Sequence, residues 1–112
     1  MTIETMRFLV HGSAEQPYEV TFQKAGDNLS AFCTCPAGEN GQYCKHRFRI
    51  FEGSTEEIVS GNAEQVPTVV AWLPGTDVAA AMAAVVAAEH EFEWAKKVVS
   101  NAKKNLAAAM RS

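Results

Sequence analysis

Residues 33–46 read CTCPAGENGQYCKH and contain all three cysteines of this chain and one of its three histidines. The four side chains form two pairs, Cys33-x-Cys35 and Cys44-x-His46, with eight residues between the pairs. Such a cluster of soft ligands favours a metal site, a disulfide or a reactive thiol. The secondary structure expected on either side of the cluster helps to decide among these.

Three strand patterns lead into this stretch. Tyr18, Val20 and Phe22 alternate with polar residues, which is typical of a strand with one buried face. Residues 25–28 (AGDN) are typical of a turn, so a further strand should return as a hairpin and end before Pro36, which cannot donate to a ladder. We predict strands at residues 6–11, 18–24 and 29–34.

Helical patterns follow the cluster. Gly53 is suited to end a helix. Ser54 and Glu57 have the spacing of a capping box, and the pair at residues 74–75 (PG) should break a helix. We predict a loop at residues 37–42, a short helix at 45–52, a helical turn at 54–57, a short helix at 62–72 capped by Asn62, and a long alanine-rich helix at 77–110 capped by Thr76 or Asp77.

A zinc ion would satisfy the two pairs geometrically. Residues two apart on an extended strand point to the same side, so Cys33 and Cys35 can converge on one ion. Two helical residues at that spacing lie roughly 200° apart around the axis, so Cys44 should precede the helix and His46 should lie in its first turn. We predict one zinc ion per chain in a closed tetrahedral site, with another thiophilic metal such as iron as an open alternative. The predicted ligands are Cys33, Cys35, Cys44 and His46.

A disulfide is disfavoured by the odd number of cysteines. The start of the chain lacks a basic leader followed by an apolar run, and its longest apolar stretch, at residues 78–88, is too short to span a bilayer. We therefore expect a cytoplasmic protein without a membrane span, in a compartment where thiols stay reduced.

The order C-x-C, gap, C-x-H, preceded by a hairpin and followed by a basic and apolar helix, resembles the SWIM zinc finger. The segments FCTCP (32–36) and CKH (44–46) are both typical of that family. The resemblance covers about residues 18–50, and all four ligand positions are filled. It implies a ββα arrangement around a structural zinc ion and a role in binding DNA or protein, often within a larger assembly.

Together these patterns predict an α+β fold. We expect a small N-terminal antiparallel sheet of about three strands with a zinc-knuckle hairpin and a short helix, followed by short helices and a long C-terminal helix. The expected domains are a β-rich zinc-finger domain at residues 1–53 with its SWIM-like core at 18–50, a helical connector at 54–75, and a long helix at 76–112 that serves as a coiled-coil and dimerisation element.

The charge distribution bears on the partner. The net charge of −3 argues against a protein that coats nucleic acid by bulk attraction. Three cations nevertheless lie around the last ligand, with no acid between Glu39 and Glu52; they are Lys45, Arg47 and Arg49. These cations either offset the negative charge of a zinc site with three thiolates or form a small phosphate-contacting face. We expect a protein–protein adaptor, with a DNA-binding module that uses these cations as the alternative.

An enzyme is not expected. The sequence has no glycine-rich phosphate loop and no Ser-His-Asp order, and four protein ligands leave zinc no open position for water. We therefore predict no catalytic residues.

The long helix contains a seven-residue repeat of one larger apolar residue and one alanine. The larger series is Val78, Val85, Phe92, Val99 and Leu106, and the second is Ala81, Ala88, Ala95, Ala102 and Ala109. This alternating three-and-four stripe is typical of a coiled-coil seam, although a single helix packed across its own domain is the alternative. We expect the helix to bind a protein partner or a second copy, most simply as an antiparallel homodimer. The predicted interface residues are Val85, Phe92, Val99 and Leu106.

Overall fold

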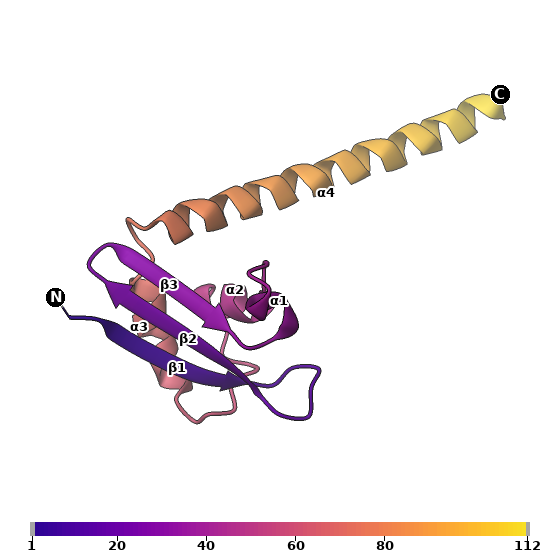
Figure 1. The fold of residues 1–112 in the computed structure, drawn as a ribbon. Coiled ribbons are helices and arrows are strands. Elements are labelled where there is room, and N and C mark those ends of the chain that lie inside the picture. Colours follow the sequence, from indigo (N-terminus) through magenta and orange to yellow (C-terminus); the bar gives the residue numbers. More distant parts are fainter. Residues whose placement is uncertain (1, 112) are drawn as a thin grey trace. The chain divides into compact units, whose positions relative to one another are not determined.

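The computed structural model describes residues 2–111 and contains two compact units, one ending at Ala80 and the other beginning at Ala81. Figure 1 labels their helices and strands. In chain order the elements are β1 (Glu4–Val10), β2 (Tyr18–Ala25), β3 (Asn28–Cys33), α1 (Pro36–Glu39), α2 (Lys45–Phe51), the 3-10 helix η1 (Ala63–Gln65), α3 (Val66–Ala71) and α4 (Asp77–Met110). An antiparallel sheet followed by short helices and a long C-terminal helix confirms the predicted α+β class.

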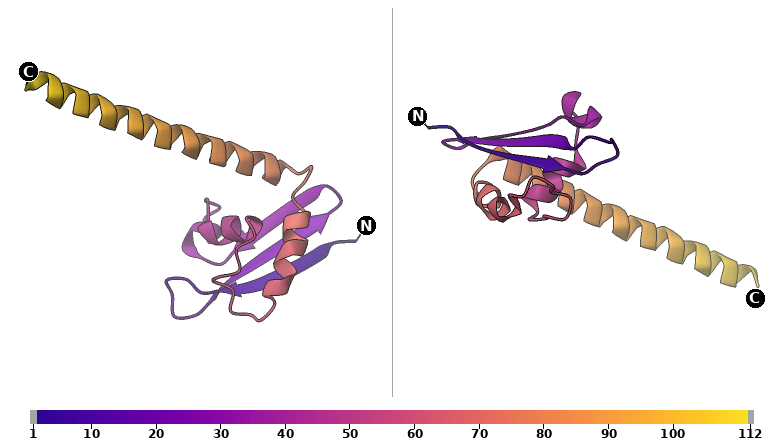
Figure 2. Two further views of the ribbon diagram at one scale, coloured as in Figure 1. Left: turned by 180° about the vertical axis from the view of Figure 1, so that it is seen from behind. Right: turned by 90° about the horizontal axis from the view of Figure 1, so that it is seen from below.

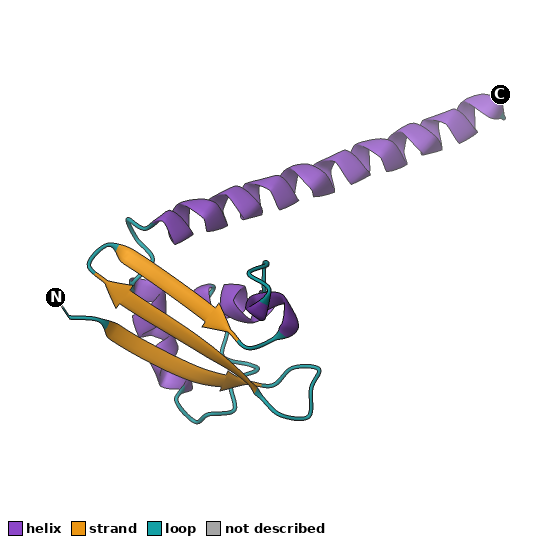
Figure 3. Ribbon diagram, in the orientation of Figure 1, coloured by secondary structure: helices purple, strands orange, loops and turns teal. Residues whose placement is uncertain are grey.

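The three strands form one antiparallel sheet in the order β1-β2-β3 (Figure 3). In the central strand, Val20 pairs with Phe8 of β1 and with Cys33 of β3. Because side chains alternate across a strand, these three residues lie on one face of the sheet. That face carries the buried residues of the sheet, which are Phe8, Val10, Val20, Phe22, Leu29 and Cys33. The strand register therefore places one thiol of the ligand cluster on the buried face.

The short helices α2 and α3 cover this face of the sheet (Figure 2). Phe22 lies between the two layers, and its ring packs edge-on against Phe8, with 5.9 Å between ring centroids, and against Phe51 of α2, at 4.9 Å. Val66 and Val69 of α3 are fully buried beside them. A core of this size is small, so a bound metal ion would add needed stability.

The predicted loop at residues 37–42 is wrong at its start, where the chain forms α1. Cys35 is the N-cap of this helix: its backbone is extended (φ −64°, ψ 158°), and its Sγ accepts a hydrogen bond from the N–H of Gly38. Pro36 occupies the first helical position, where a missing N–H loses no bond. The proline that ends the strand therefore also begins a helix.

The helical turn predicted at residues 54–57 is also wrong. The chain there forms a non-helical turn, in which the N–H of Ile58 donates to the carbonyl of Thr55 at 3.2 Å, and then pairs with the outer edge of β1. Ile58 forms an antiparallel bridge with Val10, and the N–H of Val59 donates to the carbonyl of Leu9 at 2.8 Å. This pairing covers part of an edge that would otherwise be open to other chains.

The helix predicted at residues 62–72 is present as η1 and α3, and it ends before the Pro-Gly pair that was expected to break it. Asn62 occupies the N-cap position, but the predicted cap is wrong in that its side chain forms no capping hydrogen bond. Gly75 has a φ of 82°, a left-handed conformation that favours glycine. Thr76, one of the two predicted caps, then begins α4, because its Oγ1 accepts a hydrogen bond from the N–H of Ala79 at 3.2 Å.

Helix α4 has the predicted bounds and contains 34 residues, none of which is buried. Within the described part of the chain, no helix combines the length and apolar character needed to cross a membrane.

Candidate metal centre

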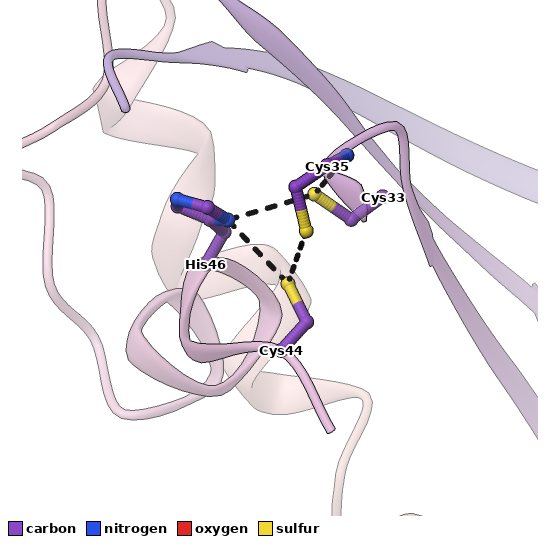
Figure 4. A group of neighbouring side chains, drawn as sticks. All are labelled: Cys33, Cys35, Cys44 and His46. Carbon is purple, nitrogen blue, oxygen red and sulfur yellow. Dashed lines mark hydrogen bonds between the residues drawn. The ribbon is translucent and has the colours of Figure 1, made fainter. Parts of the chain in front are cut away.

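The two ligand pairs meet between the end of β3 and the start of α2 (Figure 4). Cys33 is the last residue of β3, and Cys35 follows it as the cap of α1. Cys44 is the N-cap of α2 with an extended backbone (φ −138°, ψ 122°), and His46 lies in the first turn, as predicted. Since β3 ends at Cys33, the first pair converges through the bend into α1 as well as through strand alternation.

The ligand atoms of the four buried residues all lie within 4.8 Å of one another. Nδ1 of His46 is 3.5 Å from Sγ of Cys44 and 3.8 Å from Sγ of Cys33. Sγ of Cys35 is 3.5 Å from Sγ of Cys44, and all three cysteines are free thiols. Tetrahedral zinc, with bonds of about 2.3 Å to sulfur and about 2.0 Å to nitrogen, separates its ligand atoms by about 3.5–3.8 Å. The donor set and its spacing therefore suit one zinc ion.

Backbone N–H groups face the sulfur atoms. The N–H of Gly38 donates to Sγ of Cys35 at 3.3 Å, and the N–H of Cys35 donates to Sγ of Cys33 at 3.5 Å. A Cβ on Gly38 would lie 2.4 Å from the carbonyl oxygen of Cys33 and 2.9 Å from its Cβ. Only glycine therefore lets α1 approach β3 closely enough for these hydrogen bonds, which orient the ligands of a metal.

Tyr18 and Gly12 position the imidazole of His46. The rings of Tyr18 and His46 pack with centroids 5.1 Å apart. A Cβ on Gly12 would lie 3.3 Å from Nε2 of His46 and 2.4 Å from the ring of Tyr18, so this glycine leaves room for both rings. With Nε2 on that side, Nδ1 is the nitrogen that faces the sulfur atoms.

Burial and hydrogen bonding give these groups unusual pKa values. Burial raises the pKa of the Cys33 thiol to about 12. Burial also acts to raise the pKa of Cys44, but hydrogen bonds from the backbone N–H of Arg47 and from the neighbouring thiols outweigh it, so this pKa is lowered. Burial lowers the pKa of His46, which favours the neutral imidazole that a metal requires. Zinc binds thiolates, so its binding must displace the proton of Cys33.

Residues 18–51 match the family model of the SWIM zinc finger. This segment is a SWIM zinc finger. The match confirms the predicted resemblance, spans β2, β3, α1 and α2, and includes the whole ligand cluster. The chain therefore contains a zinc-binding module, and its Cys₃His cluster is consistent with one zinc ion. No curated protein and no solved structure matches the chain.

The three cations around the histidine of the SWIM finger differ in their partners. The guanidinium of Arg47 donates to two backbone carbonyls, one of which is that of Ala31 in β3, at 3.1 Å. Arg49 forms an ion pair with Glu57. The side chain of Lys45 forms no hydrogen bond or ion pair with any residue that the structure describes. Whether any of the three contacts a nucleic acid or a protein stays a prediction.

A cavity of about 350 Å³ lies beside the SWIM ligand cluster. Its wall includes three of the ligands together with Tyr18, Pro36, Tyr43 and Lys45. The side chain of Tyr43 is 63% exposed, and its ring packs against that of Phe48 at 5.8 Å. Sequence reasoning missed Tyr43, although its position directly before a ligand was an available signal. It also missed the packing roles of Tyr18 and Gly38, which follow only from the tertiary structure.

The predicted helix interface lies on one face of α4. Val85 is half-buried, while Phe92, Val99 and Leu106 are 63%, 53% and 59% exposed. The seven-residue spacing keeps them on the same side of the helix. Their role in binding a partner or a second copy stays a prediction.

Proposed function

We propose that this protein is an adaptor whose SWIM zinc finger binds another protein. This proposal rests on the partners of the cations near the zinc site. Arg47 is bound to β3, and Arg49 is paired with Glu57. That leaves Lys45 as the cation beside the cavity, which is too little charge for a strong phosphate-binding surface. The exposed ring of Tyr43 on the same wall is typical of protein interfaces, whose centres are enriched in tyrosine.

The chemistry of the cavity suggests what the partner presents. Tyr43 and Pro36 offer apolar surface, and Lys45 offers one unpaired positive charge. A peptide segment with an apolar side chain next to an acidic one would satisfy both. The volume of about 350 Å³ is at the lower end of ligand-binding cavities, so it suits one or two partner side chains.

The zinc ion has a structural role in this proposal, and the protein is not an enzyme. Four protein ligands complete a tetrahedral site, which leaves no position for a substrate or an activated water. The ligands are also buried, so the ion would hold β3, α1 and α2 together rather than face a substrate.

We also propose that the protein is cytoplasmic and that α4 pairs two copies as a coiled coil. A homodimer would present two fingers on one assembly, and two linked sites bind a repeated or dimeric partner more tightly than one site does. The seam of α4 and its exposed apolar residues support this arrangement.

A DNA-binding module is the second candidate function. Lys45 lies on the same cavity wall as Tyr43. In such a pair the cation can contact a phosphate while the aromatic ring stacks on a base. Each phosphate contact releases roughly 0.9 counterion, so one such cation would give a shallow salt dependence and weak binding.

The two candidates can be separated with the zinc-loaded full-length protein. Partners captured from a nuclease-treated extract would be identified and purified, and their affinity for Tyr43→Ser would be compared with that for Phe32→Ser. Phe32 is 56% exposed on the opposite face of the sheet, so it is a matched control. We expect about a tenfold loss of affinity for Tyr43→Ser only, as for a residue at the centre of an interface.

Retention on heparin and on single- and double-stranded DNA tests the alternative. Retention that decreases as salt is added and is lost in Lys45→Gln, without a nuclease-resistant protein partner, would contradict the adaptor proposal and support DNA binding.

A further inference from the structure

The charged residues of α4 are separated along its length. The acidic residues lie in its first half, and they are Asp77, Glu89, Glu91 and Glu93. The basic residues lie in its second half, and they are Lys96, Lys97, Lys103 and Lys104. Two parallel copies would place the acidic half beside the acidic half and the basic half beside the basic half. Two antiparallel copies would place each acidic half beside a basic half, which is favourable.

The sizes of the seam residues also favour antiparallel copies. In an antiparallel coiled coil, each larger residue of the seam packs beside an alanine of the other copy, and the distance between the helices is uniform. In a parallel coiled coil, Phe92 would pack on Phe92 and Ala95 on Ala95, so wide and narrow layers would alternate. A single interhelical distance could not then close-pack both kinds of layer.

One register pairs every residue of the seam. It places each seam residue i of one copy opposite seam residue 187 − i of the other, so that Phe92 packs beside Ala95 of the second copy at the centre. Glu89 and Lys96 each directly follow an alanine of the seam, and in an antiparallel pair this flanking position faces its own equivalent. Glu89 therefore lies beside Lys96 of the second copy, twice by symmetry. A shift by one heptad in one direction would leave Val78 and Ala81 outside the overlap and bring the two copies of Lys96 together. A shift in the other direction would leave Leu106 and Ala109 outside it and bring the two copies of Glu89 together.

We infer that two copies of α4 bind each other antiparallel in this register. The inference rests on the proposed homodimer and specifies its geometry. A second copy is the occupant that the charge pattern selects, because the complement of a helix with an acidic half and a basic half is the same helix reversed. The exposure of Phe92, Val99 and Leu106 leaves an apolar face for it to cover.

Two matched charge reversals test the orientation. In the antiparallel register, Glu89→Lys places lysine beside Lys96 of the second copy at two points. Glu91 lies on the other flank of the seam, directly before a larger seam residue, and Glu91→Lys therefore lies beside Val98 of the second copy. In a parallel pair, Glu91 would lie beside Lys96 instead, so the two variants would exchange roles. Sedimentation equilibrium of the zinc-loaded full-length protein should show a dimer dissociation constant raised about tenfold by Glu89→Lys and less than about threefold by Glu91→Lys. The double variant Glu89→Lys/Lys96→Glu should restore the wild-type value.

Distances between spin labels test the register. Labels on Asn101→Cys and Ala108→Cys in the zinc-loaded protein should be separated along the axis by about 22 Å and about 44 Å, since each residue rises about 1.5 Å. The register that brings the two copies of Lys96 together would give about 12 Å and about 33 Å, and the register that brings the two copies of Glu89 together would give about 33 Å and about 54 Å. As a control, zinc-loaded wild-type protein treated with the same reagent should remain unlabelled, because its three cysteines are buried and bound to zinc.

The antiparallel geometry and the homodimer itself would be refuted by different results. Equal short distances for both labels, or a larger effect of Glu91→Lys, would refute the antiparallel geometry but leave the homodimer. A monomer at all concentrations, with α4 still helical by circular dichroism, would refute the homodimer itself. Neither result would alter the binding comparison between Tyr43→Ser and Phe32→Ser, which tests the adaptor function separately.

Discussion

Replacing Gly38 by alanine should weaken zinc binding, although alanine is the better helix former. Gly38 lies within α1, where alanine is favoured over glycine by about 0.5–1 kcal/mol. The new Cβ would lie 2.4 Å from the carbonyl oxygen of Cys33 and 2.9 Å from its Cβ. Those atoms belong to a paired strand and cannot rotate away, so α1 must move away from β3. Because Cys35 caps α1, its thiolate moves with the helix.

The size of the effect follows from two opposing terms. Overpacking of a well-packed site costs about 1–3 kcal/mol. The helix propensity gained by alanine offsets part of this, so a net loss of about 1–2 kcal/mol remains. Since about 1.4 kcal/mol corresponds to a factor of ten, the zinc dissociation constant of Gly38→Ala should rise about five- to thirtyfold.

Competition with a fluorescent zinc chelator measures this constant, and Gly26→Ala is the control. Gly26 has a φ of +60° in the turn between β2 and β3, and a Cβ there would meet no atom within 4 Å. Its replacement strains the backbone by about 1–2 kcal/mol but leaves the ligand geometry unchanged. The cobalt-substituted protein should therefore show an altered thiolate spectrum for Gly38→Ala and the wild-type spectrum for Gly26→Ala. Wild-type affinity and spectrum in Gly38→Ala would refute the claim that its close approach to β3 shapes the site.

Three further predictions concern the zinc-finger unit. Cys44→Ser should lose zinc and unfold the β2–β3 hairpin and α2, because the binding energy of a structural site is largely folding energy. Full zinc retention in this variant, measured by elemental analysis, would show that Cys44 is not a ligand. The cobalt-substituted wild type should give an intense tetrahedral spectrum that azide does not alter, since a shift would reveal an open coordination position. Phe22→Ala should lower the free energy of unfolding of the zinc-loaded protein by about 3–5 kcal/mol in urea, because its ring contacts both Phe8 and Phe51; a loss below about 1 kcal/mol would contradict its central place in the core.

The ligand cluster could be predicted because its determinants are local. Alternation along β2 fixes which face of the hairpin is buried, and the register then places Cys33 on that face. The geometry of a helix start fixes how Cys44 and His46 can share an ion. The strands and α4 were predicted within two residues at each end for the same reason, since periodicity and capping residues act over short distances.

The incorrect predictions from sequence concern places where contacts between distant segments determine the structure. The capping-box spacing of Ser54 and Glu57 did not produce a helical turn, because pairing of Ile58 with the edge of β1 competes for the same backbone. The helix α1 depends on the sulfur of Cys35 as a cap, a role more typical of oxygen side chains. The contact between Arg47 and β3 depends on how α2 packs against the sheet, which no local pattern encodes.

The two units of this chain call for different sources of stability. The first has a core of a few aromatic and branched residues around a Cys₃His cluster, so its folding should depend on zinc. The second is a single helix with no buried residue, and a lone helix in water is only marginally stable. Its order should therefore depend on protein concentration through pairing with a second helix. Thermal unfolding should then show two transitions. A chelator should lower the midpoint temperature of the first, and a higher protein concentration should raise the midpoint temperature of the second. A single transition that responds to both treatments would show instead that the finger and α4 unfold together as one cooperative structure.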